Sequence, residues 1–195
     1  MTDERELSLV ITYKNILEVD GDTQEKVRLW RNSPRVKARM LDQSTISFER
    51  HKQWLCSLSE KAGINEVRVA FCCGAPFGII NLRNIDTDVS SCDWGFYVGD
   101  KDFLGRKLGQ RMLYNVYEWG FVELGINKMY STVRSDNLKA LYSMMQAGNY
   151  VEGFLKDHMR ESSGELIGIY LIAQFRRDWM KNREKISSWA MIGEI

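Results

Sequence analysis

The chain has 195 residues, of which 44% are hydrophobic and 27% are charged, and its net charge is +1. These values are typical of a folded globular protein of one domain, and they give no reason to expect nucleic acid as a partner. No apolar run approaches the roughly 18 residues that span a bilayer, and the polar start is no secretion signal, so we expect a cytoplasmic protein without membrane contact. With two histidines, and four cysteines outside any metal-ligand spacing, we expect reduced cysteines and no metal.

The first 60 residues are predicted to form a strand and two helices. Residues 9–15 alternate weakly between apolar and polar side chains and predict the strand. Thr23 is a suitable N-cap for the first helix, which Pro34 ends. A polar connector follows, and Ser47 is a plausible cap for the second helix. The apolar face of that helix is predicted from residues at helical spacing: Phe48, His51, Trp54, Leu55 and Leu58.

The remaining chain is predicted to alternate strands and helices. A hairpin signal at residues 74–76 joins the first two strands, and a helix begins at Leu108. Another helix begins at Asn137 and stops at Gly148, and a final hairpin follows. The predicted strands cover residues 66–73, 77–85, 91–98, 128–133, 150–158 and 166–174. This order predicts an α+β fold with helices on the faces of a sheet.

The tail from residue 176 is predicted to be a helix with a loosely ordered end, separate from a single domain at residues 1–175. Its last residues include an apolar group of Trp189, Met191, Ile192 and Ile195. This group is compatible with packing on a second copy of the chain, as in a homodimer, and equally with a flexible tail.

The segment from Asp93 to Gly109 combines a strand, a polar turn and a glycine-spaced helix start. Backbone N–H groups at a helix start bind anions, and Arg106 and Lys107 add positive charge. Glycine pairs at helix starts are also common as simple turns. The segment is not a P-loop, because no Gly-Lys-Ser/Thr sequence is present.

The order of strand, glycine turn, helix and strand, followed by Asn137-Leu138-Lys139-Ala140-Leu141 and Gly148-Asn149-Tyr150, resembles the GNAT acyltransferase superfamily. The resemblance implies a GNAT fold, with a central mostly antiparallel mixed sheet that splays at the cofactor cleft. It also implies acetyl-CoA as the acyl donor. Two residues depart from the usual Q/R-x-x-G-x-G/A motif: Leu104 replaces a Gln or Arg, and Lys107 replaces a middle Gly. Because Lys107 retains its backbone N–H, we expect pyrophosphate binding to survive.

Within that superfamily, the chain is similar to the PseH-type sugar-nucleotide N-acetyltransferases. The resemblance is carried by Trp30-Arg31-Asn32-Ser33-Pro34, Met40, the stretch from Ile46 to Trp54, and two strands with the sequences Phe77-Gly78-Ile79-Ile80-Asn81-Leu82 and Asp93-Trp94-Gly95-Phe96-Tyr97-Val98. Enzymes of that kind acetylate the 4-amino group of UDP-4-amino-4,6-dideoxy-N-acetyl-altrosamine, on the route to pseudaminic acid.

The resemblance implies two groups of binding residues. Residues implied for acetyl-CoA are Phe96, Tyr97, Val98, Leu104, Gly105, Arg106, Lys107, Leu108, Gly109, Asn137 and Met144. Residues implied for the nucleotide sugar are Arg31, Met40, His51, Trp54 and Trp94. An arginine suits a phosphate and an aromatic ring suits a uracil or sugar face. Trp54 and His51 fit equally well in a structural role, and Arg31 fits equally as a cap of its own helix.

Catalysis needs a neutral amine nucleophile and a proton for the departing thiolate. The superfamily commonly supplies that proton from a tyrosine seven residues after the Asn of the Asn-x-x-Ala helix, where this chain has Met144. Three alternatives stay open: Tyr142 reaches the site through a distorted helix, water or another group supplies the proton, or the activity is weak. The candidate bases are Asp93, by its position on the strand, and His51, by its pKa.

Three functions therefore compete. The first is acetyl transfer to the amine of a nucleotide-linked deoxyamino sugar. The second is Rim-type protein N-terminal acetylation or polyamine acetylation, whose cationic acceptors need carboxylates. Residues 31–54 instead carry an excess of positive charge, with Arg31, Arg35, Lys37, Arg39, Arg50 and Lys52 against Asp42 and Glu49. The third is a non-catalytic CoA-binding protein, which Met144 motivates.

Overall fold

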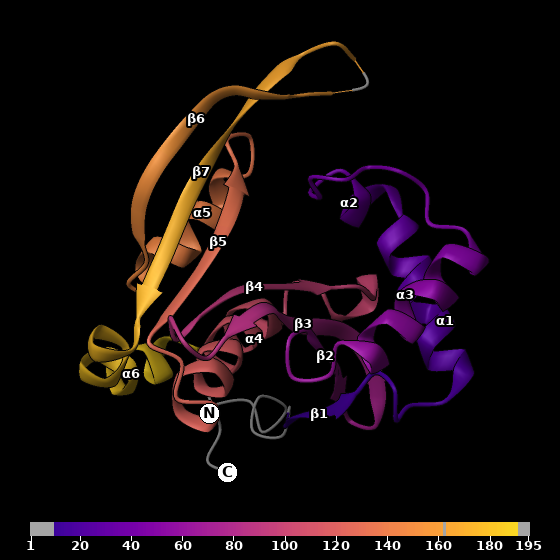
Figure 1. Cartoon of the computed structure of the whole chain (residues 1–195), viewed down its shortest axis with the longest axis horizontal. Coiled ribbons are helices and arrows are strands. Elements are labelled where there is room, and N and C mark those ends of the chain that lie inside the picture. Colours follow the sequence, from indigo (N-terminus) through magenta and orange to yellow (C-terminus); the bar gives the residue numbers. More distant parts are fainter. Residues whose placement is uncertain (1–9, 162, 191–195) are drawn as a thin grey trace, which may run out of the picture.

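The computed structural model describes residues 10–161 and 163–190, with side chains described up to residue 187. In this part of the chain, seven strands form one mixed sheet in the order β1-β2-β3-β4-β5-β7-β6 (Figure 1). The strands are β1 (Ile11–Asn15), β2 (Glu66–Cys72), β3 (Ala75–Asp86), β4 (Ser91–Val98), β5 (Lys128–Arg134), β6 (Tyr150–Arg160) and β7 (Leu166–Phe175). All neighbours pair antiparallel except β4 and β5, which are parallel. The predicted α+β fold with a mostly antiparallel mixed sheet is confirmed.

Helices cover both faces of the sheet. They are α1 (Gly21–Asn32), α2 (Pro34–Lys37), α3 (Phe48–Glu60), α4 (Leu108–Tyr117), α5 (Leu138–Gln146) and α6 (Arg176–Ala190), with a 3-10 turn η1 (Lys101–Phe103) and a π-helical turn η2 (Glu118–Glu123). In Figure 1, α1, α2 and α3 lie together at one end of the molecule, and the long β6–β7 hairpin rises at the other. The short helix α2 lies in the stretch that the sequence predicted to be a polar connector.

Of the two N-caps predicted for the first two helices, one is confirmed and the other is wrong. Ser47 caps α3 as predicted, because its side chain accepts a hydrogen bond from the N–H of Arg50. The prediction of Thr23 as the cap of α1 was wrong. The cap is Asp20, whose carboxylate accepts from the N–H of Thr23 at 2.7 Å. Both residues suit a cap, and the helix begins earlier than the apolar pattern does.

The core divides into two apolar clusters, one on each face of the sheet. The smaller packs α1 and α3 against β2 and β3, through Val27, Leu58, Val69 and Ile79. The larger packs α4, η2 and α6 against the opposite face, and its largest buried side chains include Trp94, Trp119 and Trp179. The side chains of β4 point alternately to the two faces of the sheet, so both clusters pack against this strand.

The sheet opens between β4 and β5. The two strands pair only from Ser91 to Asp93 on β4 and from Lys128 to Tyr130 on β5. Beyond that point β4 runs on to Val98 and β5 to Arg134, each paired only on its outer side. The splay expected from the resemblance is therefore present, and its vertex lies just after Asp93.

The predicted tail helix is α6, which packs on the domain. Trp179 is fully buried, and its indole N–H donates to Glu118 at 2.8 Å. Arg183 forms an ion pair with the same carboxylate at 2.9 Å. The apolar residues predicted to contact a second copy lie outside the described side chains.

Candidate functional site

A cavity of about 780 Å³ lies at the splay of the sheet. One wall comes from α1, α3 and the segment of residues 35–46 between them, and the floor comes from β2, β3 and β4. The far wall comes from β5 and the start of α5. The cavity therefore reaches both the helices that carry the predicted acceptor residues and the gap between β4 and β5.

The open side of β4 presents backbone groups to this gap. The carbonyl of Trp94 accepts from the hydroxyl of Ser131 at 2.8 Å, and the carbonyl of Val98 accepts from Arg35 at 3.0 Å. Phe96 lies between them, and the alternation of an antiparallel pair with β3 turns its N–H and C=O the same way. An extended ligand with amide groups could therefore pair here as an added strand.

The glycine turn after β4 has left-handed backbone at two residues before α4 begins. Gly105 has φ +78° and Lys107 has φ +56°, and α4 begins directly afterwards. A left-handed conformation is normally given to glycine, which explains why the superfamily motif commonly has glycine at the position of Lys107. Since this chain reaches the same conformation with lysine, the departure from the motif leaves the geometry of the turn intact.

The first turn of α4 sits against the cavity end of β4. A Cβ atom at Gly109 would lie 4.0 Å from the side chains of both Phe96 and Val98. The predicted phosphate residues 104–109 do not themselves line the cavity among the described residues. These residues lie beyond the end of the cavity that Val98 lines, at the N-terminus of α4. Leu108 is a core residue, so only its backbone is suited to contact a ligand, whereas the side chain of Leu104 is exposed.

Arg31 reaches the cavity from the last turn of α1. One guanidinium nitrogen, Nη2, donates to the backbone carbonyl of Asp42, and the other, Nη1, is buried without a hydrogen-bond partner among the described residues. Burial lowers the pKa of Arg31, although a guanidinium stays charged. The Asp42 carboxylate is bound instead by Ser44 and by Arg50, at 2.9 Å, and these bonds lower its pKa to about 2. Met40 also lines the cavity.

His51 and Trp54 are neighbours on the inner face of α3. Their rings are 5.2 Å apart and tilted by 34°. His51 is only 5% exposed, and its Nε2 lies 3.0 Å from the carbonyl oxygen of Gln24 on α1. A carbonyl only accepts, so Nε2 carries the proton, and Nδ1 is the basic nitrogen. Burial lowers the pKa of His51, and the bond to Gln24 opposes this, so the neutral ring is favoured.

Asp93 and Trp94 lie at the vertex of the splay. Asp93 is 22% exposed and forms an ion pair with Arg83 at 2.8 Å. Burial raises the pKa of its carboxyl, and Arg83 opposes this effect. Arg83 lines the cavity but Asp93 does not, so a proton would reach Asp93 through a water molecule. Trp94 is fully buried against Phe96 and Tyr117, and its edge lines the cavity.

The start and inner face of α5 form the wall opposite β4. Asn137 occupies the N-cap position, its side chain makes no capping bond, and it lines the cavity together with Met144. Tyr142 is 67% exposed and is absent from the cavity wall. The helix runs without interruption from Leu138 to Gln146, so the distortion that would bring Tyr142 inward does not occur in this structure. Tyr142 as the proton donor is therefore not supported by its position.

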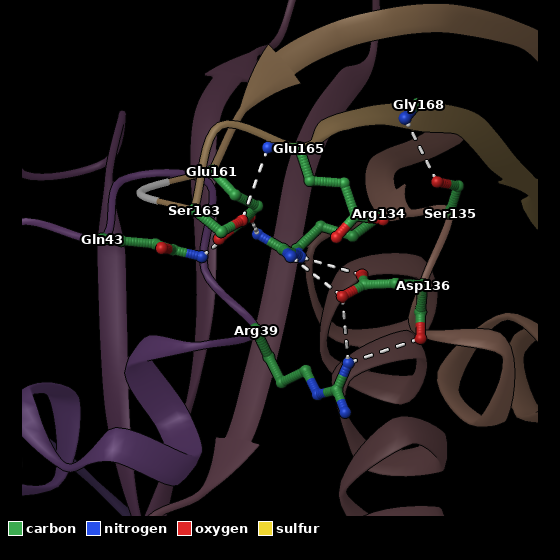
Figure 2. A network of polar contacts seen from close by, with 9 residues as sticks. All are labelled: Arg39, Gln43, Arg134, Ser135, Asp136, Glu161, Ser163, Glu165 and Gly168. Atoms are coloured by element: carbon green, nitrogen blue, oxygen red, sulfur yellow. Dashed lines mark hydrogen bonds and ion pairs between the residues drawn. The ribbon is translucent and has the colours of Figure 1, made fainter.

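Figure 2 shows a polar network that includes Arg39 and Arg134, two residues that line the cavity. Arg134, buried at the end of β5, binds Asp136 through two hydrogen bonds of 3.0 and 2.9 Å and forms an ion pair with Glu161 at the end of the β6–β7 hairpin. Arg39 contacts Asp136 at 3.4 Å, and Gln43 donates to Glu161 at 3.1 Å. The segment of residues 38–47 is thus tied to β5 and to the hairpin across the cavity.

Several cavity residues were missed by the sequence analysis. Arg35, Asn81, Arg83, Ser131 and Arg134 all line the cavity. One signal was available for Asn81, since it is a polar residue inside an otherwise apolar strand. The others follow from strand register and from the path of residues 35–46, which pattern alone does not give.

The described residues contain neither a metal-binding cluster nor a membrane-spanning helix. No group of three or more His, Cys, Asp or Glu side chains there is arranged to hold a metal ion. Within the same ranges, no helix has both the length and the apolar character needed to cross a bilayer.

Comparisons with known proteins agree on an acetyltransferase. Residues 18–149 match the model of the acetyltransferase (GNAT) domain. A curated relative, the acetyltransferase PseH of Campylobacter jejuni, is 29% identical over 132 residues, which is 68% of this chain and 80% of that protein. The spermidine N-acetyltransferase of Vibrio cholerae in complex with CoA and spermine superposes with a TM-score of 0.79 at 13% identity, over 87% of this chain and 98% of that one. A dodecameric structure of the Vibrio cholerae enzyme gives a TM-score of 0.72 at 13% identity, over 88% and 97% of the two chains.

Proposed function

Because the chain belongs to the GNAT acetyltransferase family, we propose that it transfers the acetyl group of acetyl-CoA directly to the amino group of a nucleotide-linked deoxyamino sugar. The chain is an acetyltransferase, and this much follows from the family. The acceptor is the proposed part. We take a UDP-4-amino-4,6-dideoxy sugar as its class, and we retain the cytoplasmic location expected from the sequence.

The observation that carries the proposal is the charge of the cavity. Eight basic residues and one acidic residue line it. The acidic residue, Asp42, is already bound by Arg50. A cationic acceptor would have to leave water for a positively charged surface, whereas a diphosphate would be attracted to it.

Not all of that charge is available, because several arginines are neutralised by carboxylates. Arg39, Arg83 and Arg134 each form an ion pair with a described aspartate or glutamate. Arg31 differs from these, since its hydrogen bond goes to a backbone carbonyl and one of its nitrogens is buried and unpaired. A planar guanidinium with one unpaired N–H donor group is suited to bind a phosphate oxygen.

An aromatic surface next to this charge supports a nucleotide. Trp54 is half-buried, lines the cavity and is packed against His51. A flat ring beside an arginine suits a uracil base joined to a phosphate. The match to PseH supports the same acceptor, because it covers two thirds of this chain.

The chemistry requires the amine to be neutral when it attacks the thioester carbon. The nitrogen forms the new C–N bond, the C–S bond breaks, and CoA leaves as a thiolate. A neutral His51 with Nδ1 free of the Gln24 bond could take the amine proton through water. Asp93 could do the same, although Arg83 favours its charged form and so makes it a weaker base. Met144 has no proton to donate, so we assign protonation of the thiolate to water.

Acetylation of a polyamine is the second candidate, since the structural relatives include spermidine N-acetyltransferases. Their identity to this chain is 13%, so they inform only the fold. The cavity lacks free carboxylates among its described residues, which disfavours a polyamine.

The test is to incubate the enzyme with acetyl-CoA and one acceptor at a time, and to follow the acetylated product by mass spectrometry. The acceptors are UDP-4-amino-4,6-dideoxy-N-acetyl-altrosamine, spermidine and a peptide with a free N-terminus. We expect the sugar nucleotide to be acetylated with a kcat/KM at least about a hundredfold above either of the others. Preferred turnover of spermidine or the peptide would overturn the proposed acceptor. Tight acetyl-CoA binding without turnover of any acceptor would favour a non-catalytic CoA-binding protein.

A further inference from the structure

Asn81 is a polar side chain in the apolar middle of β3. Its neighbours Ile80 and Leu82 are buried in the larger core cluster on one face of the sheet. Because side chains alternate along a strand, Asn81 points to the opposite face, which α1 and α3 cover. It lines the cavity there, and its carbonyl oxygen Oδ1 is buried without a hydrogen-bond partner among the described residues.

The position of Asn81 in the sheet places it at the vertex of the splay. It is paired across the ladder with Gly95 on β4. A Cβ atom at Gly95 would lie only 3.2 Å from Oδ1 of Asn81, so the absence of a side chain at Gly95 leaves room for the amide. Gly95 comes two residues after Asp93, the last residue of β4 that pairs with β5. Oδ1 therefore lies over the first open residues of β4.

This location is where the two substrates should meet. If the phosphates of acetyl-CoA lie at the turn of residues 105–109, the pantetheine arm runs along β4 from Val98 toward the vertex. The thioester group then lies deepest in the gap between β4 and β5. The cavity reaches the same point from the face of the sheet that α1 and α3 cover, where Asn81 and Gly95 line it. The attacking amine must therefore come close to Asn81.

An unpaired buried carbonyl oxygen is unfavourable in the free protein, since it has lost its water without gaining a donor. An apolar side chain of similar size at this position would avoid that cost. The oxygen only accepts, so it repels phosphate and carbonyl oxygens and attracts N–H or O–H groups. A donor supplied by the acceptor would satisfy it.

We propose that Oδ1 of Asn81 accepts a hydrogen bond from the amino group of the acceptor and holds the nitrogen lone pair toward the thioester. The inference rests on the proposed N-acetyltransferase function and adds a positioning residue to it. An amide suits this task better than a carboxylate, because it carries no charge and so does not favour the unreactive ammonium form. Asn81 takes no proton, and the proton lost by the nitrogen leaves through water.

The test compares Asn81→Leu, Asn81→Ala and Asn81→Asp with the wild type, using UDP-4-amino-4,6-dideoxy-N-acetyl-altrosamine as the acceptor. We expect Asn81→Leu and Asn81→Ala to lower kcat/KM by about tenfold to a hundredfold, which corresponds to one hydrogen bond to the reacting group. The affinities for UDP alone and for acetyl-CoA should stay within about twofold. The matched control is Asn182→Leu on the exposed side of α6, which should leave all of these values unchanged.

The Asn81→Asp variant separates positioning from a structural role. It keeps the acceptor oxygen but adds a negative charge, so it should hold the amine protonated and move the acidic limb of the pH–rate profile to higher pH. At high pH its rate should approach that of the wild type. A merely structural asparagine would give neither the shift nor the recovery. Unchanged kcat/KM in Asn81→Leu, or an equal loss of UDP affinity, would overturn the inference.

The outcomes also distinguish this inference from the proposed function. If the wild type acetylates spermidine instead of the sugar nucleotide, the proposed acceptor fails, and the same variants assayed with spermidine still decide whether Asn81 holds the amine. If the wild type acetylates the sugar nucleotide and Asn81→Leu matches it, only the inference fails. If no amine is acetylated, both fail.

Discussion

Replacing Arg31 by methionine tests whether this side chain binds the diphosphate of the acceptor. Methionine fills a similar length of the cavity without charge or donors. In the structure, Nη2 of Arg31 is held by the carbonyl of Asp42 and Nη1 is buried and unpaired, so the fork is already positioned before a ligand arrives. Little ordering cost therefore has to be subtracted from the interaction.

The binding free energy for UDP that Arg31→Met should lose is that of one charge-assisted hydrogen bond. Such a bond contributes about 1.5–3 kcal/mol, and each 1.4 kcal/mol is tenfold in affinity, so the Kd for UDP should rise about 10- to 150-fold. The Kd of Arg31→Lys for UDP should lie between those of Arg31→Met and the wild type, because lysine keeps the charge but loses the planar fork. The free energy of unfolding should change little, since burial opposes the charge of Arg31 in the free protein.

The assay is isothermal calorimetry with UDP and, separately, with acetyl-CoA, supported by urea unfolding of each variant. The matched control is Arg177→Met, which removes an exposed arginine from α6. Acetyl-CoA affinity should be unaffected in both variants. The reasoning is refuted if Arg31→Met binds UDP as tightly as the wild type, or if its UDP and acetyl-CoA affinities fall together.

Three further expectations concern Met144, Tyr142 and His51. Met144→Tyr should raise kcat at pH 7 by up to about 30-fold, because a thiol of pKa about 8.5 lies 1.5 units above that pH and a donor removes the penalty for leaving as thiolate. Tyr142→Phe should stay within about twofold of the wild type, and a tenfold loss in steady-state assays would contradict the exposed position of Tyr142. Burial lowers the pKa of His51, so the unfolded chain binds a proton that the folded protein does not. This contribution to stability is complete above about pH 6.5 and is lost as the pH falls through the folded pKa. Urea midpoints between pH 8 and pH 5 should fall less in His51→Gln than in the wild type, and parallel curves would refute this account.

Much of the fold could be predicted from local sequence signals. Apolar runs and the hairpin signal at residues 74–76 placed β2, β3 and β4 within about two residues, because each of these strands carries buried apolar residues. Ser47 was identified as a cap because its hydroxyl and the following apolar stripe are both visible in the sequence. Asp20 and Thr23 are equally good caps, and only the folded chain shows which of them begins the helix.

The cofactor end of the site was also accessible from the sequence. The glycine turn from Gly105 to Gly109 predicted a helix start, and α4 does begin at Leu108, after residues with positive φ at Gly105 and Lys107. A turn of this kind is specified by a few adjacent residues, so its geometry is local. Its assignment to a phosphate group stays a prediction.

The acceptor end depended on contacts between residues far apart in the chain. The pairing of Asn81 with Gly95 follows from strand register, and only the folded structure shows that Oδ1 of Asn81 is buried without a partner among the described residues. Arg31 carries the same charge as Arg39 and Arg134, and only the fold decides that the other two are neutralised while Arg31 is not. The sequence alone determined the strands and the longer helices, the family resemblance and the sign of the charge near residues 31–54. The tertiary structure decided which of those charges and polar atoms lack a protein partner, because pairing is a property of positions in space and local pattern contains no information about it.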